Sequence, residues 1–217
     1  MISSTYDLPM HGNYFAEDGY LTHDPKSGTI RNRAGARMLA LTDDFLAAAQ
    51  DTLEAEFGER APAVLAAAAQ DWGRRAAEQF AAEMEQYHGR PLAQLPLSLF
   101  AADLTEAFRR HGWGILSIDF AQHPYGLLLV EVKTPISSAN TSGPVDALLA
   151  GFLAGMFSQF TGATLDCLKS DCPSRGASQS RFVLTVPERL HAVDGWVARG
   201  KGHAEILADL KRARESR

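Results

Sequence analysis

The residues best suited to chemistry lie between Cys167 and Arg181, where the only two cysteines of the chain flank a polar turn. Apolar segments on either side of Gly176 predict a strand, a tight loop and a second strand, which would fix side chains at the base of the loop. Thiolates are good zinc ligands, but tetrahedral zinc needs four ligands, usually Cys or His. Beside Cys172 the segment offers only Cys167 or Asp171. The residues alone therefore do not predict a zinc site here.

Other catalytic signatures are absent from the sequence. Gly151 and Gly155 fall inside a predicted helix, not in the strand–turn–helix context of a phosphate-binding loop, and no Gly-x-Ser-x-Gly motif occurs. Most histidines lie at predicted helix ends or turns, where a solvated imidazole is expected. None has metal-ligand spacing to another, and the seven are His11, His23, His88, His111, His123, His191 and His203. The sequence favours a binding protein over an enzyme, with no catalytic residue and no cofactor.

Large apolar side chains recur along the predicted helices and could line an internal ligand pocket. The candidates are Trp72, Phe80, Phe100, Phe108, Trp113, Phe152, Met156 and Phe160. Such residues usually fill a core, and interiors normally pack without large voids. An enclosed apolar cavity of several hundred Å³ would favour a ligand-binding module. A solid interior with a large apolar interface would favour a structural or interaction protein that functions as a dimer.

Helical spacing of apolar residues predicts the elements that position these side chains. Helices are expected over 45–57, from Pro62 to about 88 and from Pro96 to about 108. A fourth, strongly apolar helix is expected over 144–160. Its small residues form a stripe that allows another backbone to approach closely, at Ala147, Gly151, Ala154, Gly155 and Ser158.

Alternation of apolar and polar residues, with a period of two, predicts the strands. Residues 115–120 and 127–133 flank a turn and read as one hairpin, and residues 164–168 and 181–186 read as another. Strands that pair locally, with helices between the hairpins, predict an α+β fold. We expect an antiparallel sheet of about four strands in two hairpins, with the helices packed on one face.

Composition sets the class of protein and its surroundings. The 217 residues, 46% hydrophobic and 22% charged, fit one globular unit. We expect an N-terminal arm at 1–27, an α+β domain at 28–190 and a helical tail at 191–217. The net charge of −5 argues against a nucleic-acid partner. The longest apolar stretch, 145–160, is shorter than the roughly 20 residues of a membrane span. A chain with two cysteines and no signal peptide is expected in the cytoplasm.

Three stretches resemble the 4-vinyl reductase domain, which is also the sensory domain of phenol- and xylene-responsive transcription activators. The first is Gly28–Ile30 with Arg37–Leu39 and the helix that follows. The second is Gly151–Gly162, and the third runs from Cys172 to Val183. The resemblance implies the fold of the TRAPP vesicle-tethering subunits. It also implies a homodimer and a pocket between helices and sheet for a small hydrophobic ligand, such as an aromatic, a hydrocarbon or a tetrapyrrole-like molecule.

The resemblance further implies a zinc site in the sensors, held by a Cys before the long helix and by a Glu and two Cys around the last hairpin. Carried over to this sequence, these positions are Asp146, Lys169, Cys172 and Ser180. Only Cys172 matches; Asp146 could ligate a metal, and Ser180 and Lys169 are poor ligands. We therefore expect this metal site to be vacant.

Two alternatives remain open at this point. His111–Gly114, with the strand that follows, and Pro144–Gly162 resemble the cellulose-synthase D family of accessory proteins. That resemblance implies an oligomeric accessory subunit of polymer export. The 4-vinyl reductase name itself implies an enzyme of bacteriochlorophyll (tetrapyrrole) metabolism. Because no DNA-binding or ATPase domain follows the candidate sensory region, a sensor of this kind would act through a separate protein partner.

Overall fold

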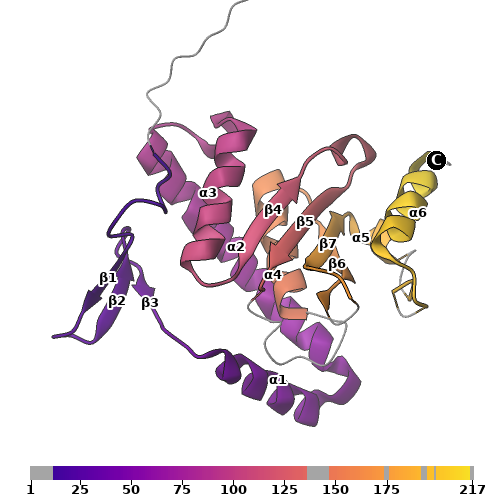
Figure 1. Ribbon diagram of the computed structural model, residues 1–217, viewed down its shortest axis with the longest axis horizontal. Coiled ribbons are helices and arrows are strands. Elements are labelled where there is room, and N and C mark those ends of the chain that lie inside the picture. The colour runs from indigo at the N-terminus through magenta and orange to yellow at the C-terminus, as the bar shows by residue number, and fades with distance from the viewer. Residues whose placement is uncertain (1–11, 136–146, 174–175, 192–194, 198, 216–217) are drawn as a thin grey trace, which may run out of the picture.

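Two antiparallel hairpins form the central sheet of the protein (Figure 1). The structure is a computed structural model, and it describes residues 12–135, 147–173, 176–191, 195–197 and 199–215. Strand β4 (Ile115–Asp119) pairs with β5 (Leu128–Lys133), and β6 (Asp166–Asp171) pairs with β7 (Ser180–Thr185). Strands β5 and β7 join the hairpins in the order β4-β5-β7-β6. The predicted α+β fold, with an antiparallel sheet of two hairpins, is confirmed.

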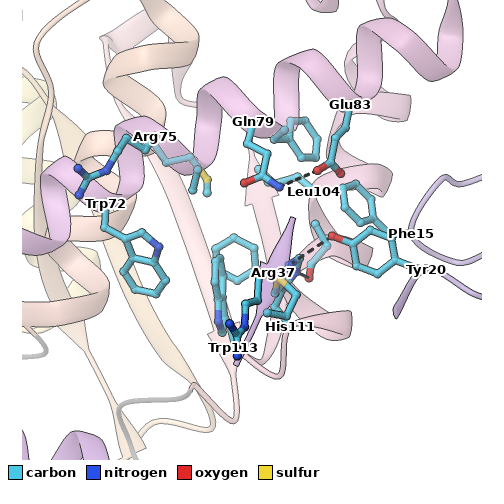
Figure 2. Close-up of a pocket in the computed structure, with 16 residues that line it drawn as sticks. Phe15, Tyr20, Arg37, Trp72, Arg75, Gln79, Glu83, Leu104, His111 and Trp113 are labelled. Atoms are coloured by element: carbon cyan, nitrogen blue, oxygen red, sulfur yellow. Dashed lines mark hydrogen bonds between the residues drawn. The ribbon is translucent and has the colours of Figure 1, made fainter. Parts of the chain in front are cut away.

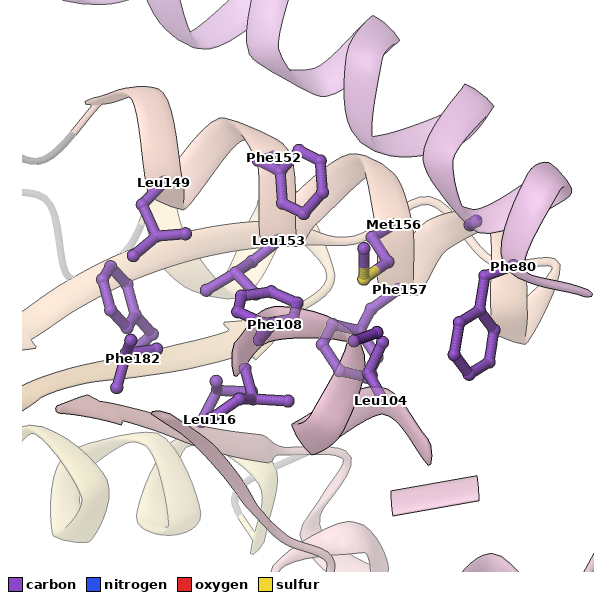
Figure 3. Close-up of a cluster of buried hydrophobic side chains, with 14 of the residues drawn as sticks. Phe80, Leu104, Phe108, Leu116, Leu149, Phe152, Leu153, Met156, Phe157 and Phe182 are labelled. Atoms are coloured by element: carbon purple, nitrogen blue, oxygen red, sulfur yellow. The ribbon is translucent and has the colours of Figure 1, made fainter. Parts of the chain in front are cut away.

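One face of the sheet carries the main helical layer, made of α2 (Ala61–His88), α3 (Leu97–Arg110) and α4 (Ala147–Thr161). Helix α4 packs against both the sheet and α2, which explains why it is apolar on nearly all sides. Figure 3 shows its side chains packed against Phe108, Leu116 and Phe182. These contacts form the principal hydrophobic core.

Helices α2 and α4 approach each other until their backbones touch. A Cβ atom added at Gly155 would lie 2.0 Å from the Gln70 carbonyl oxygen, and one added at Gly151 would lie 2.3 Å from the Ala66 carbonyl oxygen. A Cβ at Gly73 of α2 would lie 2.1 Å from the Phe152 carbonyl oxygen. The close approach predicted from the small-residue stripe is therefore confirmed for its glycines.

The opposite face of the sheet is covered as well, which the sequence did not predict. Helices α5 (Pro187–His191) and α6 (His203–Glu215) bring Leu190, Ile206 and Leu210 onto Leu129 and Val183. Because β5 and β7 carry apolar residues on both faces, both faces must be shielded from water. The helical layer is thus not confined to one face.

The N-terminal segment forms a second, three-stranded sheet beside α2 and α3 (Figure 1). It consists of β1 (Leu21–Asp24), β2 (Thr29–Asn32) and β3 (Arg37–Met38). The β1–β2 hairpin spans the expected boundary between residues 27 and 28.

Helix α1 (Asp43–Phe57) follows this small sheet and stands apart from the central one (Figure 1). None of its described side chains is buried. Short 3₁₀ turns complete the chain at η1 (Gly58–Arg60), η2 (Leu92–Gln94) and η3 (His123–Tyr125). None of the helices within the described ranges is long and apolar enough to cross a membrane.

Helix α6 is attached to the sheet through a histidine whose charge state matters. The Ser170 hydroxyl and His203 Nδ1 are 2.7 Å apart. Burial, and then the Arg181 guanidinium, lower the pKa of His203, with Asp171 and Glu131 opposing the shift. The folded protein therefore disfavours the imidazolium, and this part of the stability is lost as pH falls below the unfolded pKa of about 6.5.

Replacing His203 by Gln should reduce the acid sensitivity of folding. Between pH 7.5 and pH 5 the free energy of unfolding, measured with urea, should fall less in the variant than in the wild type, because the variant has no imidazole to protonate. His23→Gln, which removes an exposed imidazole instead, is the control. Equal slopes for the wild type and His203→Gln would contradict the prediction.

Candidate ligand-binding site

A cavity of about 290 Å³ lies between α2, α3 and the N-terminal segment (Figure 2). We call it the inner cavity. Among the sequence-predicted pocket residues, Trp72 and Phe80 of α2, Phe108 of α3, Trp113 and Met156 line it. The remaining wall comes from Phe15, Tyr20, Arg37, Met38, Arg75, Ala76, Gln79, Glu83, Leu104, Ala107 and His111.

The other predicted pocket residues lie elsewhere. The Phe152 ring sits behind the inner cavity, with its centroid 4.5 Å from that of Trp72 and 4.7 Å from that of Trp113. Phe100 and Phe160 line a second depression of about 850 Å³. This second depression, which we call the outer groove, lies between α2, η2, the ends of α3 and α4, and the sheet. The predicted set is therefore divided between two cavities, and Phe152 lines neither of them.

One end of the inner cavity is polar. His111 Nδ1 is 2.7 Å from the Ala107 carbonyl oxygen, and because a carbonyl only accepts, Nδ1 carries the proton. Burial lowers the pKa of His111, which favours the neutral ring. Its Nε2 is then an acceptor, and the Tyr20 hydroxyl donates a hydrogen bond to it at 3.3 Å (Figure 2). The Asn32 side chain also hydrogen-bonds to the Tyr20 oxygen, whose second lone pair can accept one further hydrogen bond.

A buried carboxylate braces the same end of the inner cavity. Glu83 Oε1 accepts hydrogen bonds from Asn32 Nδ2 at 3.0 Å and from Gln79 Nε2 at 2.8 Å. Burial first, and then Glu83, raise the pKa of Tyr14 to about 12 and also raise that of Tyr20. Both phenols are therefore protonated at neutral pH. Glu83 thus links the N-terminal sheet to α2.

Sequence reasoning missed the contribution of the N-terminal segment. Phe15 and Tyr20 are each 2% exposed, and with Met38 they close one side of the inner cavity. A signal was present, since Tyr14, Phe15 and Tyr20 cluster in an otherwise polar stretch. The expectation of a solvated imidazole was wrong for His111, because Tyr20 and Trp113 cover the end of α3 where it lies.

The positions at which the resemblance implies zinc ligands do not fit zinc. Asp146 lies outside the described residues. Cys172 is buried, and Ser180 is 0% exposed with an Oγ that has no hydrogen-bond partner among the described atoms. Lys169, 9% exposed, would place a cation beside the metal. Within the described ranges no group of three or more His, Cys, Asp or Glu residues could hold a metal ion.

Comparisons with known proteins give a fold but no sequence family. Neither the family models nor the curated proteins give a match. Among solved structures, the phenol-responsive sensory domain of the transcription activator PoxR, solved with phenol, is similar with a TM-score of 0.60 and 19% identity. The likeness covers 78% of this chain and 86% of that one.

Two further structures are similar with lower scores. A vinyl-4-reductase family protein from Methanocaldococcus jannaschii has a TM-score of 0.46 and 14% identity over 68% of this chain and 83% of that one. A trafficking protein particle complex subunit 3 from Naegleria fowleri, covalently bound to palmitic acid, has a TM-score of 0.47 and 14% identity over 66% and 93%. On the stronger PoxR likeness, this chain has the fold of a phenol-responsive sensory domain.

Proposed function

We propose that this chain is a non-catalytic binding protein that holds a small aromatic molecule in the inner cavity. The observation that carries the proposal is a partly open, largely aromatic cavity of about 290 Å³ between α2, α3 and the N-terminal segment. An engineered apolar cavity of roughly 150 Å³ in another protein binds benzene, so one substituted ring fits here. The four pyrrole rings of a tetrapyrrole would exceed the inner cavity.

The polar end of the inner cavity indicates how such a ligand is oriented. A ring lying against Trp72, Trp113 and Phe108 would make edge and face contacts with aromatic side chains. A hydroxyl on that ring could donate to the Tyr20 oxygen, whose own proton is held by His111. Two hydrogen bonds in series strengthen each other. The PoxR sensory domain, which has this fold, was solved with phenol, and this supports a phenol-like ligand.

Titration calorimetry with phenol and toluene tests the proposal. Wild type should bind both, and Tyr20→Phe should weaken phenol about two- to tenfold by removing one hydrogen bond. Toluene, which has no hydroxyl, should bind the variant as it binds the wild type. Absence of binding for both compounds, with no small molecule retained in native mass spectrometry, would overturn the proposed function.

We also propose that the protein acts as a homodimer and signals through a separate protein partner. Leu39 and Leu41, 72% and 59% exposed, lead into α1, where Phe45 and Phe57 are also exposed. Apolar residues spread along a helix with no buried side chain are better explained by a second copy than by solvent. Sedimentation velocity measures the oligomeric state directly. The proposal includes no zinc, and it assigns the protein to the cytoplasm, where cysteine thiols stay reduced.

A further inference from the structure

The inner cavity and the outer groove lie on opposite sides of α2. Ala76 and Phe80 line the inner cavity, whereas Ala77 and Ala81 line the outer groove. Residues four apart share a helix face, and neighbouring residues point about 100° apart. Two apolar spaces are therefore held apart by one helix and by the side chains that flank it.

Three phenylalanine rings separate the two spaces. Phe80 lines the inner cavity, and Phe100 and Phe160 line the outer groove. The Phe80 ring centroid is 6.0 Å from that of Phe100 and 5.6 Å from that of Phe160, in edge-to-face contact. Phe100 and Phe160 are in turn 5.1 Å apart. The Phe80 ring is thus the inner side of an aromatic partition.

The partition is held in place from the inner side too. The Phe15 ring stacks on Phe80 with centroids 5.7 Å apart and planes 6° apart. Phe80 itself is 6% exposed. Because rings contact it on both sides, the Phe80 side chain has little room to rotate, and the end of the inner cavity is fixed.

We propose that Phe80 sets the length of the ligand, restricting the site to single-ring aromatics with short substituents. This inference rests on the proposed function and specifies its ligand class. Removing the ring would extend the inner cavity to the rings of Phe100 and Phe160, whose far sides line the outer groove. These rings could then shift into the vacated space, so that an alkyl chain could pass from the cavity into the groove.

The experiment measures dissociation constants for phenol, 2-ethylphenol, 2-butylphenol and 2-hexylphenol, whose alkyl chain leaves the ring beside the hydroxyl and so on the side of Tyr20, Phe15 and Phe80. Wild type should bind phenol and 2-ethylphenol and lose at least about tenfold in affinity by 2-hexylphenol, since a longer chain must displace packed side chains. Phe80→Ala should reverse this order, with affinity rising about two- to fourfold per buried methylene. If Phe80→Ala folds poorly, the milder Phe80→Leu replaces it. Its dependence of affinity on chain length should be intermediate between wild type and Phe80→Ala.

Leu104→Ala provides the matched control. Leu104 is 1% exposed and also lines the inner cavity, but it does not line the outer groove. The Leu104→Ala variant should therefore lose affinity at the same alkyl chain length as wild type. If Leu104→Ala binds the long-chain phenols with the same affinity as the Phe80 variants, added cavity volume alone explains the binding of long chains, and the inference fails. It also fails if wild type binds phenol but the Phe80 variants keep the wild-type profile. If wild type binds none of these phenols, the proposed function itself fails.

Discussion

Replacing Gly155 by Ala is expected to lower the free energy of unfolding by about 3 kcal/mol or more, a large share of a typical domain's stability. In an isolated helix the same change would be stabilising by roughly 0.5–1 kcal/mol, because alanine restricts the unfolded chain. Here the new Cβ would lie 2.0 Å from the Gln70 carbonyl oxygen and 2.8 Å from its carbon. Backbone atoms cannot rotate away, so α2 and α4 would have to separate along their whole contact.

Urea unfolding of Gly155→Ala and Gly202→Ala tests this expectation. An added Cβ at Gly202 would meet only the end of the Glu205 side chain, at 3.8 Å. Gly202 precedes α6 and its N–H donates to Glu205, so this variant changes only a helix N-cap and should lose about 1 kcal/mol at most. A Gly155→Ala protein as stable as wild type would show that α2 and α4 do not pack backbone to backbone.

The helix-packing surface was predictable because its signal is local. Gly151 and Gly155 share one face of an apolar helix, and small residues at that spacing permit close approach whatever the partner is. The strands were equally readable, since alternation along 127–133 is a property of neighbours. The second helical layer could not be predicted in this way. Leu129 and Val183 lie next to each other on one face of the sheet only when β5 and β7 are paired.

The candidate site was only partly predictable, for a different reason. Phe108 and Phe152 are alike in type and burial, yet only Phe108 lines the inner cavity. Which aromatic residue borders a void depends on where distant segments meet, and here the missing wall is supplied by Phe15 and Tyr20 from a turn-rich stretch. That stretch has no periodicity from which its position could be inferred.

Filling the inner cavity should strongly weaken ligand binding without harming the fold. Ala76 lies on its α2 wall, and Ala76→Trp would place an indole in a space of about 290 Å³. The volume left would approach the roughly 150 Å³ that holds a single benzene in another protein, but with an altered shape. We expect phenol affinity to fall about 100-fold, or roughly 2.7 kcal/mol. Stability should be maintained or increased, because filling a cavity commonly stabilises.

The matched variant is Ala81→Trp, which changes the same residue type on the same helix but faces the outer groove. Calorimetry with phenol and thermal unfolding should be run on both proteins. Loss of phenol binding in Ala76→Trp but not in Ala81→Trp assigns phenol to the inner cavity, because a general disturbance of α2 would affect both variants. If Ala81→Trp alone loses phenol, the outer groove is the binding site, and the polar end formed by Tyr20 and His111 has no part in recognition.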